Sequence, residues 1–467
     1  MNDVDPVEEF FARERRDIHP APGDDGHWAA IVDAHRRSRR SRWTGFAAGA
    51  AAAAVLVGGV GYLLRPGDGT TALPGSRTGS TSTSLSSTPT GSATSPAGTS
   101  TSAPTSTATS RPVTVGVPAD FRLVSVSQAD NSTLFGLGIT NCKGHACTQV
   151  VRSLDSGKSW RAVATFGQEV DTPGRTSSGK VGTRTSLTEI RMASPLVGWV
   201  FGAGVRQTTD GGFTWHPYAV PGGGVVSLET DGNTVAVAVA TGSCDGSHCS
   251  GDLATAVADT TANGITEAQY TIPTSAPIRA ADYNWFNGDL YLSLATDKGA
   301  TAGLLEAKGW VTGTKGCAAS GGVSRVVAPA SGGTVFGICP GGAAAGSSSY
   351  GIVTRKVDGT WQQVVAPDSG ALLLTNAGST SFAAADSTHL LAVSGGDPAV
   401  HGSMKVSSDG GVAWHDPKSA PPVPDRGWAW VGSPGAGTYY AIPFGGSGVL
   451  WRSTDKGETW TTVQVAS

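Results

Sequence analysis

After residue 112 the hydrophobic positions fall in short runs in which apolar and polar residues alternate, separated by Gly, Ser, Asp and Asn. Alternation with a two-residue period places one face of an extended segment on a core, so it predicts β-strands. No amphipathic helix pattern interrupts residues 113–467, which therefore predict an all-β domain. The predicted strands are Phe121–Ser127, Ser132–Ile139, Thr188–Met192, Val197–Phe201, Val225–Glu229, Thr234–Val239, Asp289–Leu294, Thr334–Ile338, Ser349–Val353, Ala371–Leu374, Leu390–Val393, Trp428–Val431 and Thr438–Ile442.

One pattern, Ser/Thr-x-Asp-x-Gly-x-x-Trp, occurs four times in this domain. Its glycine permits the positive φ of a tight hairpin turn, and its Asp can accept backbone N–H groups across that turn, assisted by the Ser/Thr hydroxyl. The Trp opens the next strand and buries a large ring. Four copies indicate a structural role, because one active site does not need four. The sixteen positions are Ser153, Asp155, Gly157, Trp160, Thr208, Asp210, Gly212, Trp215, Ser407, Asp409, Gly411, Trp414, Ser453, Asp455, Gly457 and Trp460.

These copies resemble the Asp-box (bacterial neuraminidase, BNR) repeat, a hairpin between the third and fourth strands of certain β-propeller blades. The resemblance implies a sialidase-like β-propeller. Val197–Gly202, which precedes one copy, is as similar to the assembly-factor type of Asp-box propeller as to the sialidase type.

The spacing of the four aspartates predicts the number of blades. Their steps are 55, 199 and 46 residues, and the middle step holds about four repeats of about 50 residues. Three decayed blades should therefore lie between Asp210 and Asp409, with fourth strands beginning near residues 160, 215, 266, 310, 361, 414 and 460. The prediction is a seven-bladed β-propeller over residues 113–467.

An uncharged run precedes this domain and predicts a transmembrane helix. Trp43–Leu64 contains 22 residues without a charge, which is enough to cross a bilayer core of about 30 Å. Five arginines lie within residues 36–42 and only Arg65 follows closely, so the N-terminus should be cytoplasmic and the propeller extracellular. A cleaved signal peptide would need a much shorter charged region than residues 1–42. The small-residue series Gly45, Gly49 and Ala53 could pack against a second helix and form a dimer.

The remaining segments give a linker and a tail. Residues 65–112 are rich in Ser, Thr, Gly and Pro, and they predict a disordered linker, either an O-glycosylated stalk or an unmodified tether. Residues 1–42 form the cytoplasmic tail, in which Asp5 and Pro6 suggest a capped helix start with Phe10 and Phe11 on its apolar face. The tail has weak similarity to juxtamembrane segments of actinobacterial membrane regulators that dock a cytoplasmic partner. The tail therefore either sets the orientation of the protein in the membrane or has a regulatory role.

The charge and the cysteine content of the chain bear on its partners and on its disulfides. The net charge is -3 with 15% charged residues, so no global field points to nucleic acid. All six cysteines lie in the predicted extracellular domain, and their even number predicts three disulfides, with sequential pairing the simplest of 15 connectivities. A Cys/His metal site involving His145 or His248 is the alternative, but the two loops lack further ligands. The pairs are Cys142/Cys147, Cys244/Cys249 and Cys317/Cys339.

No catalytic constellation accompanies the repeats. The resemblance to sialidases implies an arginine cluster, an Arg-Ile-Pro element and a Tyr/Glu pair, and the chain has no Arg-Ile-Pro. Side chains that match in type are scattered: Arg191, Arg279, Arg325, Tyr439, Tyr440 and Glu458. We therefore expect no catalytic, cofactor-binding or metal site.

These observations favour a non-catalytic binding or scaffolding propeller, tethered to the cell membrane by one helix and facing a protein or wall-glycan ligand. Gly341–Ser349 and Thr172–Thr185 are the most insertion-like loops for partner contact. A wall-polysaccharide glycoside hydrolase and a transmembrane sensor with a regulatory tail are the alternatives.

Overall fold

The computed structural model describes residues 115–167, 187–202, 204–244, 248–286, 288–306, 309–312, 325–327, 334–344, 347–355, 361–365, 372–375, 378–397, 399–435 and 437–466. These residues form strands, turns and bends and contain no helix. No helix long and apolar enough to cross a membrane is therefore present in this part of the chain. The predicted tail, transmembrane helix and linker all lie outside the described residues.

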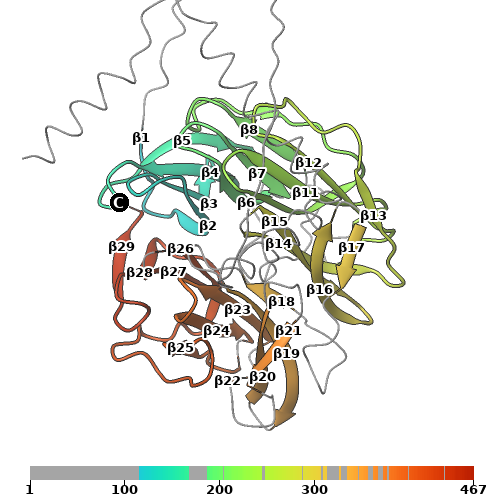
Figure 1. Cartoon of the computed structure of the whole chain (residues 1–467). Coiled ribbons are helices and arrows are strands. Elements are labelled where there is room, and N and C mark those ends of the chain that lie inside the picture. The colour runs from blue at the N-terminus through green and yellow to red at the C-terminus, as the bar shows by residue number, and fades with distance from the viewer. Residues whose placement is uncertain are drawn as a thin grey trace, which may run out of the picture. The chain divides into compact units, whose positions relative to one another are not determined.

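Seven antiparallel sheets form a ring (Figure 1), so the described chain is an all-β seven-bladed propeller and the predicted blade number is confirmed. We number the sheets as blades 1 to 7 in chain order. Blade 1 contains β1 (Val115–Gly116), β2 (Arg122–Gln128), β3 (Leu134–Cys142), β4 (His145–Ser153) and β5 (Arg161–Phe166); blade 2 contains β6 (Leu187–Met192), β7 (Gly198–Gly202), β8 (Val205–Thr208) and β9 (His216–Pro217).

Three blades separate the second and third copies of the repeat, as the spacing predicted. Blade 3 contains β10 (Gly224–Thr230), β11 (Thr234–Ala240), β12 (Leu253–Asp259) and β13 (Tyr270–Ile272); blade 4 contains β14 (Ile278–Phe286), β15 (Asp289–Thr296), β16 (Gly299–Glu306) and β17 (Gly309–Thr312). Blade 5 contains β18 (Arg325–Val327), β19 (Val335–Ala344), β20 (Ser347–Arg355) and β21 (Trp361–Val365), with β22 (Leu372–Thr375) also paired to β20.

The last two blades differ in how complete they are. Blade 6 contains β23 (Gly378–Ala384), β24 (Leu390–Gly396) and β25 (Met404–Ser407); blade 7 contains β26 (Trp428–Gly435), β27 (Thr438–Pro443), β28 (Val449–Ser453) and β29 (Thr461–Gln464). The fourth strand expected near residue 414 is reduced to one bridge between Val406 and His415. The fourth strand of blade 3, expected near residue 266, begins at Tyr270.

The core lies between neighbouring blades, and β11 shows how one strand serves two interfaces. Its valines at 235, 237 and 239 are fully buried in the cluster shared with blade 2. The intervening alanines at 236, 238 and 240 are fully buried in the cluster shared with blade 4. Side chains of a strand alternate between its two faces, so a strand covered on both sides is apolar throughout.

The ring closes by packing of blade 1 on blade 7, and each of these blades is built from one continuous segment. The Leu123 N–H donates to the Ser447 carbonyl at 2.8 Å, and Arg452 Nη1 donates to the Ser156 carbonyl at 3.1 Å. Leu123 and Leu450 are fully buried in the shared apolar cluster. The first strand, β1, joins the outer edge of blade 1 beside β5.

Serine hydroxyls connect the innermost strands of neighbouring blades. Ser125 of β2 accepts the Ile190 N–H of β6 at 3.2 Å, and Ser227 of β10 accepts the Tyr283 N–H of β14 at 3.3 Å. Ser381 of β23 accepts the Val431 N–H of β26 at 3.2 Å. Innermost strands cannot pair as a continuous sheet around the ring, so these bonds satisfy buried backbone donors and fix the strands around the axis.

The four repeats adopt one turn. In the second copy, Asp210 Oδ1 accepts the Thr208 hydroxyl at 2.9 Å and the backbone N–H groups of Phe213 and Thr214 at 3.0 and 2.9 Å. Asp210 Oδ2 accepts the Thr214 hydroxyl at 2.7 Å. The Trp215 indole N–H donates to the Gly212 carbonyl at 2.9 Å. Each repeat thus ties its turn and its tryptophan together by side-chain to backbone bonds.

Two successive residues of each turn have positive φ, as the central residues of a type I′ β-turn do. In the first copy Ser156 has φ 59° and Gly157 has φ 89°. In the fourth copy the pair is Lys456 at 69° and Gly457 at 90°. The residue before the glycine therefore also adopts a left-handed conformation; it is a glycine in the second and third copies, Gly211 and Gly410, but not in the first and fourth.

Candidate functional site

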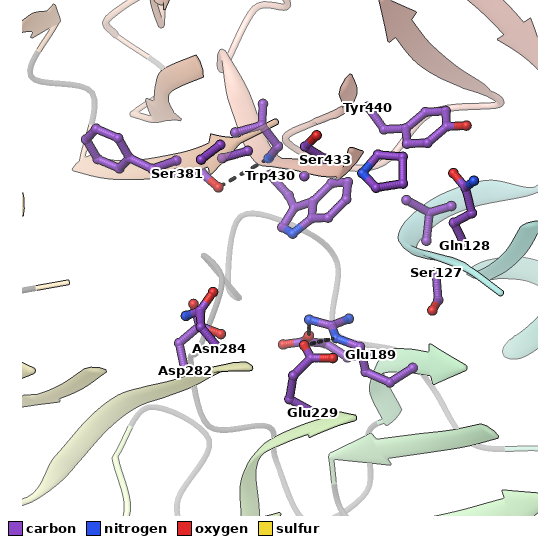
Figure 2. Close-up of a pocket in the computed structure, with 18 of the residues that line it drawn as sticks. Ser127, Gln128, Glu189, Glu229, Asp282, Asn284, Ser381, Trp430, Ser433 and Tyr440 are labelled. Atoms are coloured by element: carbon purple, nitrogen blue, oxygen red, sulfur yellow. Dashed lines mark hydrogen bonds and ion pairs between the residues drawn. The ribbon is translucent and has the colours of Figure 1, made fainter. Parts of the chain in front are cut away.

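The innermost strands of all seven blades meet at a central pocket of about 270 Å³. Its lining comes from β2, β6, β10, β14, β18, β23 and β26, together with Tyr440 of β27. Figure 2 shows Glu189, Glu229, Asp282 and Asn284 on one side and Trp430, Ser433 and Tyr440 on the other. The pocket is therefore chemically asymmetric although the ring is built from repeats.

The charged side is organised around Arg191 of β6. Arg191 Nη2 lies 2.7 Å from Glu189, Nε donates to Glu229 of the next blade at 2.9 Å, and Nη1 donates to the Ile190 carbonyl at 3.0 Å. The Arg191 side chain is 17% exposed and each of these two glutamates is 24% exposed. One guanidinium thus joins two blades and holds two carboxylates at the pocket wall.

A second ion pair extends this side. Asp282 of β14 lies 3.2 Å from Arg325 of β18, and Arg325 Nη1 also donates to the Thr380 carbonyl of blade 6 at 2.9 Å. Asn284 donates to the Val326 carbonyl at 3.2 Å. The paired charges therefore run through blades 2, 3, 4 and 5 in order around the axis.

Burial and mutual repulsion disturb the ionisation of these groups. Burial raises the pKa of Glu189 despite the opposing effect of Arg191, and the charges of Asp282 and Glu229 add to the rise. Burial likewise raises the pKa of Glu229, again against Arg191. Burial lowers the pKa of Arg191, but Glu189 and Glu229 outweigh it and raise that pKa overall. Both glutamates are therefore harder to ionise than a glutamate side chain in water.

The opposite side presents Trp430 of β26. A Cβ atom at Gly432 would lie 2.2 Å from Trp430 Cζ2, so the absence of a side chain there lets the indole lie across the strand. Tyr440 is only 6% exposed and packs in the interface of blades 1 and 7. Trp430 therefore supplies the aromatic surface that faces the charged wall (Figure 2).

The scattered candidates from the sequence separate into two groups. Arg191, Arg325 and Tyr440 all line the pocket, although sequence spacing does not connect them. The other three lie elsewhere and have structural partners: Arg279 pairs with Asp297, the Tyr439 hydroxyl donates to the His389 carbonyl, and Glu458 pairs with His415.

Three pocket carboxylates were missed at the level of sequence: Glu189, Glu229 and Asp282. Each lies on an innermost strand whose neighbouring residues are buried. An acidic residue within such an apolar strand could have indicated the site, because a buried carboxylate needs a charged or hydrogen-bonding partner.

Of the two segments expected to contact a partner, the described residues of Gly341–Ser349 do not line this pocket. Gly341–Ser349 was expected to be a loop, but β19 and β20 continue into it as a hairpin, and β22 pairs with β20 there. Backbone pairing on both edges of β20 overrides the loop-like Gly/Ala/Ser composition. Thr172–Thr185 lies outside the described residues.

Two of the predicted disulfides are confirmed. Cys142 pairs with Cys147, with Cα atoms 5.8 Å apart, and Cys244 pairs with Cys249, at 4.1 Å. Cys339 is also disulfide-bonded, and Cys317 lies outside the described residues, so their pairing stays a prediction. No group of three or more His, Cys, Asp or Glu side chains suited to a metal occurs in the described part of the chain.

The chain is similar to several solved structures at low sequence identity. No protein-family model and no curated protein matches the chain. Among solved structures, YCF48 bound to D1 peptide is 14% identical with a TM-score of 0.44, over 73% of this chain and 95% of that one. The Niastella koreensis GH74 enzyme is 14% identical with a TM-score of 0.38 over 73% of this chain, which spans 65% of its length. Saccharomyces cerevisiae Sqt1 is 9% identical with a TM-score of 0.42, over 74% and 85%.

Proposed function

We propose that this chain is a non-catalytic binding module, an Asp-box propeller held outside the cytoplasm by a single membrane helix. The central pocket receives part of a protein ligand. One observation carries the proposal: seven innermost strands converge on a small pocket that offers ion-paired carboxylates on one wall and an indole on the other. A few convergent polar groups in a concave site are typical of ligand recognition.

The pocket's size supports binding of one group over processing of a chain. Its volume of about 270 Å³ lies just below the range of about 300–1,000 Å³ that drug-sized ligands occupy. An endo-acting glycoside hydrolase must hold several sugars across its acid and base. The ion pairs also oppose hydrolysis, because Arg191 contacts both Glu189 and Glu229.

Photo-crosslinking in cells tests the binding proposal. A photoreactive residue would replace Gln128, which lines the pocket, or Gln362, which is exposed on the outer strand β21. We expect an adduct with a discrete protein from position 128 and none from position 362, and the adduct should weaken in Glu229→Gln. Adducts from position 362 alone, or from neither position, would contradict the proposal.

A wall-polysaccharide hydrolase is the second candidate, favoured by three carboxylates in one pocket and by the raised pKa of Glu189 and Glu229, as general acids require. The test incubates the purified full-length protein with wall glycan and measures new reducing ends. Turnover in the parent that disappears in Glu229→Gln, with an unchanged unfolding midpoint, would establish hydrolysis and overturn the non-catalytic proposal.

A further inference from the structure

We propose that the central pocket binds a cationic side chain, the ammonium of lysine or the guanidinium of arginine, presented by a peptide segment of the ligand. This rests on the proposed binding function and adds the chemistry of the group that enters. The other charge type, an acidic side chain, is the competing occupant that the experiment must separate.

The balance of charges favours a cation. Among the described residues that line the pocket, three carboxylates face two guanidinium groups: Glu189, Glu229 and Asp282 against Arg191 and Arg325. All three nitrogens of Arg191 already donate to protein acceptors, so this arginine has little capacity left for an anion. With every group ionised, this described part of the lining has one uncompensated negative charge.

The pocket also retains acceptor atoms. The ion pairs use Oε2 of Glu189 and Oδ2 of Asp282. Within the described residues the other oxygen of each carboxylate, Oε1 of Glu189 and Oδ1 of Asp282, accepts no hydrogen bond. These side chains are 24% and 29% exposed, so an entering ammonium or guanidinium group can reach them. An N–H donor with positive charge suits a carboxylate oxygen better than any neutral group does.

The indole completes the recognition. Trp430 lies across the pocket from Glu189, Glu229 and Asp282 (Figure 2), and the face of an indole ring attracts a cation more strongly than the other aromatic rings do. A cation between these walls would contact negative charge on one side and the ring on the other. The same ring would oppose a carboxylate. Burial has already raised the pKa of Glu189 and Glu229, and an entering cation would stabilise their charged forms.

The experiment titrates the full-length protein in detergent with capped pentapeptides Gly-Gly-Xaa-Gly-Gly, where Xaa is lysine, arginine, citrulline or glutamate. Saturation-transfer NMR at low ionic strength gives the dissociation constants. We expect the lysine and arginine peptides to bind at least about tenfold more tightly than the citrulline and glutamate peptides. Citrulline has nearly the shape of arginine without its charge, so it separates charge from size.

Variants locate the binding in the pocket. Asp282→Asn and Trp430→Leu should each weaken the arginine peptide about tenfold, whereas Glu267→Gln should change it less than about twofold. Glu267 is exposed on the loop before β13, so its substitution removes the same charge as a pocket carboxylate but outside the site. Only variants whose thermal unfolding midpoint equals that of the parent protein are used to interpret binding. Glu189→Gln replaces Asp282→Asn if loss of the Arg325 partner unfolds the protein.

The outcomes are separable. Equal binding of all four peptides, no binding by any of them, tighter binding of glutamate, or no loss in Trp430→Leu would overturn the cation proposal. If position 128 still crosslinks to a protein, the binding function survives that failure. If cationic peptides bind the pocket but no adduct forms at position 128, the cation site stands and the proposed function fails.

Discussion

Replacing Asp210 with alanine should destabilise the propeller by about 2–3 kcal/mol. The carboxylate accepts four hydrogen bonds, from the Thr208 hydroxyl, the N–H groups of Phe213 and Thr214 and the Thr214 hydroxyl, at 2.7 to 3.0 Å. A net hydrogen bond to a charged group contributes about 1.5–3 kcal/mol when shielded, and less where water can replace it. Thr214 is exposed, so water recovers part of the loss, and the total stays well below four full contributions.

The third repeat provides an internal comparison. Ala413 stands where the other copies have Ser159, Thr214 and Thr459, so Asp409 accepts the Ser407 hydroxyl and the Ala413 N–H but no hydroxyl from position 413. Asp409→Ala should therefore cost about 0.5–1 kcal/mol less than Asp210→Ala, and Thr214→Ala should cost about that same difference.

Urea unfolding of the full-length protein, followed by tryptophan fluorescence, measures these differences as shifts in the midpoint at constant slope. An Asp210→Ala midpoint equal to that of the parent would refute a stabilising role for the carboxylate. A larger loss for Asp409→Ala than for Asp210→Ala would refute the count of hydrogen bonds as the source of the energy.

Three further predictions follow from the repeats and the disulfides. Trp460→Ala should cost about 3–5 kcal/mol and Trp215→Ala less, because Trp460 is 8% exposed and Trp215 is only half-buried; the urea midpoint checks the order. Ser159, through its hydroxyl first and its N–H next, lowers the pKa of Asp155 to about 2, so the stability from this carboxylate is complete above its ordinary value of 3.8 and is lost as the pH falls toward about 2. Between these two pH values, the Asp155→Asn variant should lose less folding stability on acid titration than the parent protein does. Alkylation without reduction, read by mass spectrometry, should leave Cys142, Cys147 and both cysteines of the Cys244–Cys249 pair unmodified.

The repeats explain why the architecture could be predicted. Each copy encodes its turn within eight residues. The hydrogen bonds of Asp155, Asp210, Asp409 and Asp455 are made within that segment, so the turn can be predicted without knowing which distant residues it contacts. Their spacing then gives the number of blades. The reduced fourth strand of blade 6 was not predictable in this way, because a repeat fixes a turn without fixing the length of the strand that follows.

The pocket could be predicted only in part. Arg191 and Arg325 were identified by residue type, but ring closure brings them to one place from blades 2 and 5. Glu229 and Asp282 carry no motif, and their role depends on which strand of each blade lies innermost. Gly432 shows the same limit, because its small size matters only once the Trp430 ring lies over it.

The attachment of β1 has a mechanical consequence. The chain of residues 1–114 enters the propeller through Val115–Gly116, which pairs along the outer edge of blade 1 with Ala162 and Arg161. A force applied through those residues acts first on β1, which has only two residues. β1 can separate from β5 while β2 to β5 keep their pairing with one another. The contact of blade 1 with blade 7 does not involve β1 in its backbone bonds, so the ring remains shut under a pull that removes it. We therefore expect a force applied from the N-terminal side to detach β1 before it strains the ring.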